Sequence, residues 1–176
     1  MAFNIKNCIA VIVAYPDMMV APELLEFFHG IGMNTQQIRY HKEGRDICCA
    51  YNVSCKIALK SKANFFFFAD NDIRPQRPDC EPFILKKGYD ITSIKYPTGI
   101  EDSWNDERSF HCGLWKCSRK VLEAIKPPYF LWPRTTDGCD YEACPSAYLA
   151  GKAHDIGLTT GHLGYAEHIV KHGAGC

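Results

Sequence analysis

Apolar residues occur in short runs that alternate with segments of helical spacing. Cys8–Ala14 is a β-branched run, which predicts a buried strand. Residues 22–32 have proline in the first turn and an apolar stripe, which predicts a helix. Residues 35–40 predict a second strand, and residues 45–62 a second helix with its apolar side chains on one face. This alternation favours a parallel sheet with helices on both faces.

The most apolar segment of the chain is followed by acidic residues. Four consecutive phenylalanines at 65–68 predict a central strand that is buried on both faces, and the acidic turn Asp70-Asn71-Asp72 follows one residue later. Open α/β sheets bind ligands at this carboxyl edge. Side chains at i and i+2 of an extended segment point the same way, so both carboxylates can reach one hard cation. The alternative is a simple turn that closes the strand, because Asp and Asn favour turns.

The second half of the chain predicts further alternation, with weaker signals. We expect loops at 73–79 and 97–109, a helix at 80–87, strands at 89–96 and 111–117, a helix capped by Ser118 that runs to 125, a helix that opens at 136–140 and stops at Gly151, and a final strand at 154–160 that leads into Gly161-His162-Leu163-Gly164. The fold class that we expect is α/β, with a central, mostly parallel mixed sheet flanked by helices.

Composition fits one globular domain spanning residues 1–176. The 176 residues are 47% hydrophobic and 12% aromatic, and we see no internal repeat. Twenty basic residues balance twenty acidic ones, so composition gives no support for nucleic acid or an anionic membrane as the main partner. No apolar run approaches the ~20 residues that a membrane span needs.

Cysteine is abundant, but its spacing does not indicate a disulfide framework or a zinc finger. None of the ten cysteines forms a C-x-x-C pair, and several lie inside apolar segments, where a thiol behaves as a small hydrophobe. We therefore expect reduced thiols in a cytoplasmic protein. The first residues also lack the charged-then-apolar pattern of a signal peptide.

Polar groups that can do chemistry gather where the predicted elements begin or end. Asp70 and Asp72 follow the central strand, Asp137 and Asp140 lie at a predicted helix start, and His162 follows the predicted last strand. Two carboxylates and one imidazole suit Mn²⁺, or Mg²⁺ with the histidine less favoured, and would leave open positions for a phosphate-bearing ligand.

Each remaining candidate has a structural alternative. Arg45 could add a bidentate phosphate contact, or be a solvated residue at a helix start. Asp140 could be a general base, or only a carboxylate at a helix N-terminus that interacts favourably with the helix dipole. His162 could be a metal ligand, or a structural histidine near a glycine turn. The sequence leaves all three open.

Taken together, the order of these motifs resembles the glycosyltransferases of the GT-A fold. Residues 65–72 match their strand with the D-x-D motif, and Gly138-Cys139-Asp140 stands where many members carry Gly-Glu-Asp. Gly161-His162-Leu163-Gly164 is similar to the segment that supplies their third metal ligand. The resemblance extends from Ile9 to about Gly164, and it implies a Rossmann-like GT-A fold.

The resemblance also implies an activity and a set of roles. The activity is transfer of a sugar from a UDP- or GDP-linked donor to a hydroxyl of a glycan or another acceptor. Mn²⁺ or Mg²⁺ would be held by Asp70, Asp72 and His162 against the diphosphate. The donor would contact the end of the first strand and the following loop, together with the acidic turn and the second helix: Ala14, Tyr15, Pro16, Asp17, Arg45, Asp70 and Asn71. Asp140, with Asp137 beside it, would carry the catalytic role, as general base if the enzyme inverts.

Aromatic residues in loops are candidates for binding the acceptor, because sugar rings present apolar C–H faces. Trp104 and Trp132 lie in predicted loops and fit this role, whereas Trp115 lies in a predicted strand and is expected in the core.

Two other classes of function stay open. A sugar-phosphate nucleotidyltransferase would be expected to carry a glycine-rich basic loop after the first strand, and the segment after Ala14 has neither feature. A non-catalytic module of the same fold would bind metal or carbohydrate without turnover.

Overall fold

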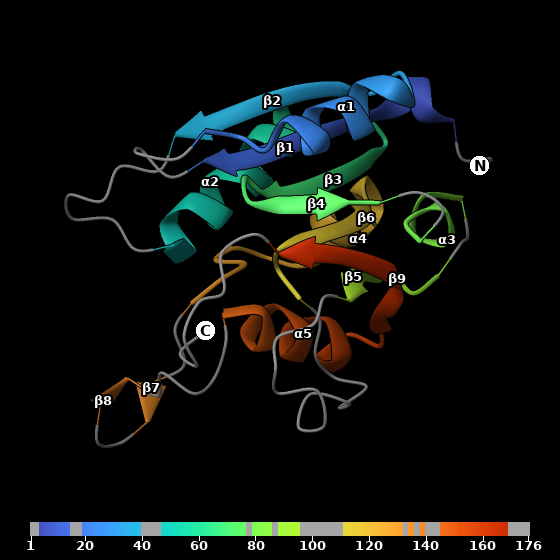
Figure 1. Cartoon of the computed structure of the whole chain (residues 1–176). Coiled ribbons are helices and arrows are strands. Elements are labelled where there is room, and N and C mark those ends of the chain that lie inside the picture. The colour runs from blue at the N-terminus through green and yellow to red at the C-terminus, as the bar shows by residue number, and fades with distance from the viewer. Residues whose placement is uncertain are drawn as a thin grey trace.

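A seven-stranded mixed sheet, flanked by helices, organises the chain (Figure 1). The computed structural model describes residues 4–14, 19–39, 47–76, 79–85, 88–95, 111–131, 134–135, 138–139 and 145–168. The elements in these ranges are η1 (Ile5–Asn7), β1 (Cys8–Ala14), α1 (Pro22–Gly30), β2 (Asn34–Arg39), α2 (Ile47–Lys60), β3 (Phe65–Asp70), β4 (Ile73–Pro75), α3 (Glu81–Leu85), β5 (Ile91–Lys95), β6 (Leu114–Ser118), α4 (Arg119–Ala124), β7 (Arg134–Thr135), β8 (Gly138–Cys139), α5 (Pro145–Asp155) and β9 (Thr160–His168).

The strand order in the large sheet is β2-β1-β3-β6-β5-β9-β4. Parallel pairing is confined to β2-β1-β3 and to β5-β9, while β6 and β4 run antiparallel to their neighbours. Figure 1 shows β2, β1 and β3 at one end of the sheet and β5, β9 and α5 towards the other. The predicted α/β class and the mixed sheet flanked by helices are confirmed.

The phenylalanine run forms β3 and sends side chains into both layers. Phe66 and Phe68 pack in the cluster that includes residues of α2, α4 and α5, whereas Phe67 packs with residues of α1 and α3 on the opposite face. Trp115 of β6 stacks on Phe68 with ring centroids 4.1 Å apart, and it is 1% exposed. Its predicted place in the core is confirmed. Alternation of side chains along the strand therefore anchors both helical layers to β3.

Helix ends near the sheet are held by specific polar contacts. The Ser118 hydroxyl accepts a hydrogen bond from Val121 N–H at the start of α4, as its capping position predicts. The Arg119 guanidinium donates to three backbone carbonyls at the end of α2, those of Leu59, Ser61 and Ala63. These contacts supply donors to carbonyls at the helix end, which lack a partner within the helix.

The boundaries predicted for the last helix and strand were wrong. Gly138 and Cys139 form β8 rather than part of a helix start, and α5 continues through Gly151 to Asp155. Packing of Leu149, Ala150 and Ala153 against the sheet outweighs the ~1 kcal/mol cost of a helical glycine. The reversal comes later, at Gly157 with φ +79°.

The predicted strand at 154–160 is replaced by β9, which begins at Thr160 and contains His162. The glycines here allow neighbouring groups to approach closely. A Cβ on Gly161 would lie 2.3 Å from the Tyr89 ring, and Gly164 has φ +78° with the Asp79 carbonyl 2.4 Å from where its Cβ would stand. The glycine-rich segment is therefore strand rather than loop.

The segment after the acidic turn also differs from the prediction. Ile73–Pro75 was expected to be loop, but it forms β4 and pairs antiparallel with β9. Proline is compatible with this position because β4 lies at the edge of the sheet.

Candidate functional site

The carboxyl end of β3 carries the two carboxylates that the sequence singled out. Asp70 is the last residue of β3, and its backbone N–H donates to the Gly113 carbonyl at 2.8 Å. The Tyr51 hydroxyl of α2 donates to the Asp70 carboxylate, with oxygen distances of 2.9 and 3.2 Å. Asp72, two residues on, is only 3% exposed. The structure thus places both acids at the sheet edge that the sequence predicted.

Asn71 joins this edge to the segment that follows β1. Its N–H donates to the Val13 carbonyl, its carbonyl accepts from Ala21 N–H, and its side-chain amide donates to the Met19 carbonyl at 3.1, 2.7 and 3.2 Å respectively. Ala14, a predicted donor contact, ends β1 at the same edge. The acidic turn therefore fixes where the chain re-enters the fold after β1.

His162 lies away from this edge. Among the described residues, no group of three His, Cys, Asp or Glu side chains gathers as a metal site, so Asp70, Asp72 and His162 are not brought together. The register gives the reason, because His162 pairs with Ser93 in the first part of β9 whereas Asp72 directly precedes Ile73, which pairs with His168. Six positions along a strand correspond to roughly 20 Å.

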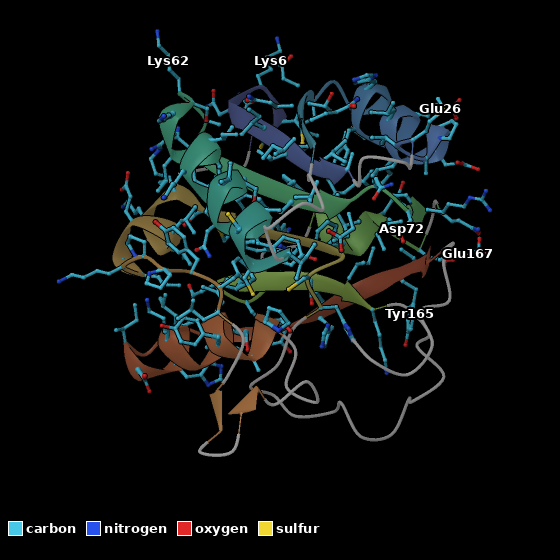
Figure 2. The ribbon with its side chains drawn as sticks, turned by 90° about the vertical axis from the view of Figure 1, so that its left-hand side faces the viewer. Lys6, Glu26, Lys62, Asp72, Tyr165 and Glu167 are labelled. Carbon is cyan, nitrogen blue, oxygen red and sulfur yellow. The ribbon has the colours of Figure 1, made fainter. Side chains whose placement is uncertain are left out.

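The same register brings a second histidine to the acidic edge. His168 ends β9, and its backbone pairs with Ile73, the residue after Asp72. Figure 2 shows Asp72 at the same end of the molecule as Tyr165 and Glu167 of β9. Sequence reasoning missed His168 because it ended the final strand at residue 160. The signal that could have found it is the pairing of two short segments, 73–75 and 166–168.

His162 instead belongs to a polar cluster with Ser93 and His111. Ser93 Oγ lies 2.7 Å from His162 Nδ1 and accepts the His111 backbone N–H at 3.1 Å. The two imidazole rings are tilted by 44° with centroids 4.8 Å apart. Burial, followed by the positive charge of Lys95, lowers the pKa of His162. Burial, His162 and Lys95 lower the pKa of His111 to about 4. Both rings are therefore neutral at neutral pH.

The remaining predicted site residues lie outside the described residues. They are Tyr15, Pro16, Asp17, Arg45, Trp104, Trp132, Asp137 and Asp140. Residues 129 and 130, which come shortly before Trp132, are hydrogen-bonded to the side chain of Asn52 in α2. Its Oδ1 accepts from Tyr129 N–H and Phe130 N–H at 2.7 and 3.2 Å, and its Nδ2 donates to the Phe130 carbonyl at 2.7 Å.

Two general expectations concern thiols and membranes. Among the described residues, Cys8, Cys55, Cys80 and Cys117 have free thiols, and burial raises the pKa of Cys8 and Cys80 to about 11. Within the described ranges, no helix has the length and apolar character to cross a membrane.

Comparison with solved structures identifies similar folds at low sequence identity. The chain is similar to A197 from STIV, with a TM-score of 0.65 and 18% identity over 92% of this chain and 85% of that one. It is also similar to the catalytic domain of Drosophila beta1,4galactosyltransferase 7 in complex with xylobiose, with a TM-score of 0.64 and 12% identity over 93% of this chain and 71% of that one. A mutant of the Drosophila enzyme, solved with manganese, UDP-Gal and xylobiose, has a TM-score of 0.63 and 13% identity over the same shares of the two chains.

These likenesses establish the fold, which this chain shares with glycosyltransferases. No protein-family model matches the chain, and no curated protein sequence matches it.

Proposed function

We propose that this protein transfers a sugar from a nucleoside diphosphate donor to an acceptor hydroxyl, with the help of a divalent cation. The observation that carries the proposal is the acidic turn Asp70-Asn71-Asp72 at the carboxyl end of β3, bonded through Asn71 to the segment that follows β1. The shared fold supports it, since the Drosophila enzyme was solved with manganese, UDP-Gal and xylobiose.

The residues at the edge suit a hard cation. Carboxylate oxygens are the ligands that Mn²⁺ and Mg²⁺ prefer, and two carboxylates stand here two residues apart. The Tyr51 hydroxyl bonds to Asp70, as a ligand-orienting group does at metal sites. Asp72 is buried, and a bound cation would stabilise the charge of its carboxylate. We assign Asp70 and Asp72 as ligands, and the backbone register makes His168 the histidine to test in place of His162.

A bound cation would neutralise the charge that develops on the diphosphate as it leaves. The protein's own residues would bind and orient the donor, with Asn71 and Ala14 at the edge and the predicted contacts Tyr15, Pro16, Asp17 and Arg45. Asp140, with Asp137, is proposed to take the proton from the acceptor hydroxyl. Trp104 and Trp132 are proposed to bind the acceptor.

The test is release of nucleoside diphosphate from UDP-, GDP- and CDP-sugars, with water or a disaccharide such as xylobiose as acceptor. We expect release from at least one donor with MnCl₂, and loss of release with EDTA. Asp72→Asn should reduce the rate at least about a hundredfold. Removing a ligand charge weakens binding of the cation, which supplies several kcal/mol of transition-state stabilisation. Asp155→Asn, an exposed acid at the end of α5, is the matched control and should leave the rate unchanged.

Two results would oppose the proposal. One is release that proceeds equally in Asp72→Asn and in the wild type. The other is metal binding without turnover of any donor, which would favour a non-catalytic module.

A further inference from the structure

The polar cluster of Ser93, His111 and His162 lies in an apolar part of the sheet. Ser93 is fully buried at 0% exposure, and its hydroxyl contacts His162 of β9 and the backbone N–H of His111, which precedes β6. Trp115 of β6 pairs with Ser93 of β5, and it belongs to the hydrophobic core. Buried polar groups in such surroundings are costly unless all of them are hydrogen-bonded, so an incomplete cluster requires a reason.

One ring nitrogen of the cluster is incompletely bonded. Ser93 Oγ accepts the His111 N–H at 3.1 Å and lies 2.7 Å from His162 Nδ1, which donates to this oxygen in one tautomer and accepts from it in the other. His162 Nε2 is buried and has no hydrogen-bond partner in the part of the chain that the structure describes. The cluster therefore presents one buried ring nitrogen that lacks a hydrogen-bond partner.

The charges and hydrogen-bonding capacity of the cluster indicate the kind of group that would satisfy this nitrogen. Burial and the positive charge of Lys95 lower the pKa of His162, and the same charge opposes a metal cation. A hydroxyl group both donates and accepts, so it can pair with Nε2 in either tautomer of the neutral ring, and saccharides are rich in hydroxyl groups.

The register places the cluster on the same sheet face as Asp70. Phe68 pairs with Trp115, Trp115 with Ser93, and Ser93 with His162, so the four residues form one row across β3, β6, β5 and β9. Residues opposite one another in a sheet share a face, and Asp70 shares the face of Phe68 two positions away. Three strand spacings from β3 to β9 amount to roughly 14 Å. The cluster and Asp70 therefore share a face of the sheet, and the buried side chains of Phe68 and Trp115 lie between them.

We propose that His162, held by Ser93 and packed against His111, forms a hydrogen bond through Nε2 with a hydroxyl of the saccharide substrate. The inference deepens the proposed transferase function by naming a sugar-binding subsite. Because Nε2 is covered in this structure, the side chains around it must shift when the sugar binds.

The experiment measures binding of three probes to the wild type and to His162→Leu, His162→Gln and Ser93→Ala. The probes are UDP with Mg²⁺, UDP-galactose or UDP-glucose with Mg²⁺, and a panel of free sugars that includes xylose, galactose, glucose, mannose and xylobiose. ¹⁵N spectra of histidine-labelled protein report the His162 ring directly. Glutamine keeps a donor near the position of Nε2, whereas leucine removes it.

We expect His162→Leu to weaken binding of a saccharide roughly tenfold, the effect of one lost hydrogen bond, while UDP affinity stays within about twofold. His162→Gln should restore much of the loss, and Ser93→Ala should give an intermediate loss. Loss of the advantage of UDP-sugar over UDP would assign the subsite to the donor, and loss of free-sugar binding would assign it to the acceptor.

Two outcomes would overturn the inference. In the first, His162→Leu binds every saccharide probe as the wild type does. In the second, no saccharide probe shifts the His162 ring resonances of the wild type at up to about 0.1 M. Failure of the proposed function itself is distinguishable, because the wild type would then release no nucleoside diphosphate from any UDP-, GDP- or CDP-sugar.

Discussion

Removing the Asn52 side chain should destabilise the protein by an amount that its contacts define. Asn52 of α2 accepts hydrogen bonds from Tyr129 N–H and Phe130 N–H, and it donates to the carbonyls of Cys48 and Phe130 at 2.8 and 2.7 Å. Residues 129 and 130 are buried, so the two N–H groups have little access to water in Asn52→Leu. Each unsatisfied buried donor costs about 1–3 kcal/mol.

We therefore expect Asn52→Leu to lower the free energy of unfolding by about 3 kcal/mol, since Asn52 is half-buried and water recovers part of the loss. For a domain of this size, 1 kcal/mol corresponds to ~2–4 °C, so Tm should fall by roughly 6–12 °C. Asn52→Asp keeps the two acceptor contacts but faces both carbonyls with a carboxylate, and should be destabilised as well.

The assay is thermal and urea unfolding followed by circular dichroism. Lys56→Ala, an exposed change on the same helix, is the matched control and should stay within about 0.5 kcal/mol of the wild type. If Asn52→Leu melts within about 2 °C of Lys56→Ala, the Asn52 side chain does not hold residues 129 and 130 to α2.

Three further predictions concern the sheet and its histidines. Gly164→Ala should cost about 2 kcal/mol or more in the free energy of unfolding, because φ is +78° and the new Cβ would meet the Asp79 carbonyl oxygen; Gly151→Ala, which meets nothing within 4 Å in a helix, should instead stabilise by about 0.5–1 kcal/mol. Arg119→Lys keeps the charge but loses the fork that reaches three carbonyls, and should cost about 1–3 kcal/mol in urea titrations. The pKa of His111 is lowered from 6.5 to about 4, so between these pH values the unfolded state binds more protons; stability should be fully present above pH 6.5 and fall as pH drops towards 4, and His111→Gln should flatten this slope.

Each of these has a contrary outcome. Equal effects of the two glycine changes would contradict the positive φ and close approach at residue 164. A fully stable Arg119→Lys would show that charge alone caps α2. An unchanged pH slope in His111→Gln would mean that other groups carry the acid sensitivity.

The first half of the fold was predictable because its signals are local and strong. The β-branched run of β1 and the four phenylalanines of β3 can only be satisfied by burial, and their alternation with two amphipathic helices defines the parallel part of the sheet. The position of Asp70 and Asp72 at the edge followed directly from where the apolar run ends.

The second half depends on contacts distant in sequence, which local patterns do not report. Gly151 was taken as a helix stop, but packing of α5 on the sheet overrides the propensity of one exposed glycine. β4 has only three residues and exists because β9 pairs with it, some ninety positions later. His162 was expected after the last strand, but it lies within β9 and pairs with Ser93 of β5, a contact between residues distant in sequence.

Asp70 and Asp72 are proposed to hold a divalent cation against a nucleoside diphosphate. Titration calorimetry of UDP, GDP and CDP into the protein, with MnCl₂ and with EDTA, measures this binding. We expect at least one nucleotide to bind at least about tenfold more tightly with Mn²⁺, and we expect Asp72→Asn to abolish this difference while Asp155→Asn retains it. Equal binding with and without the metal for all three nucleotides, or no binding of any, would contradict the proposal.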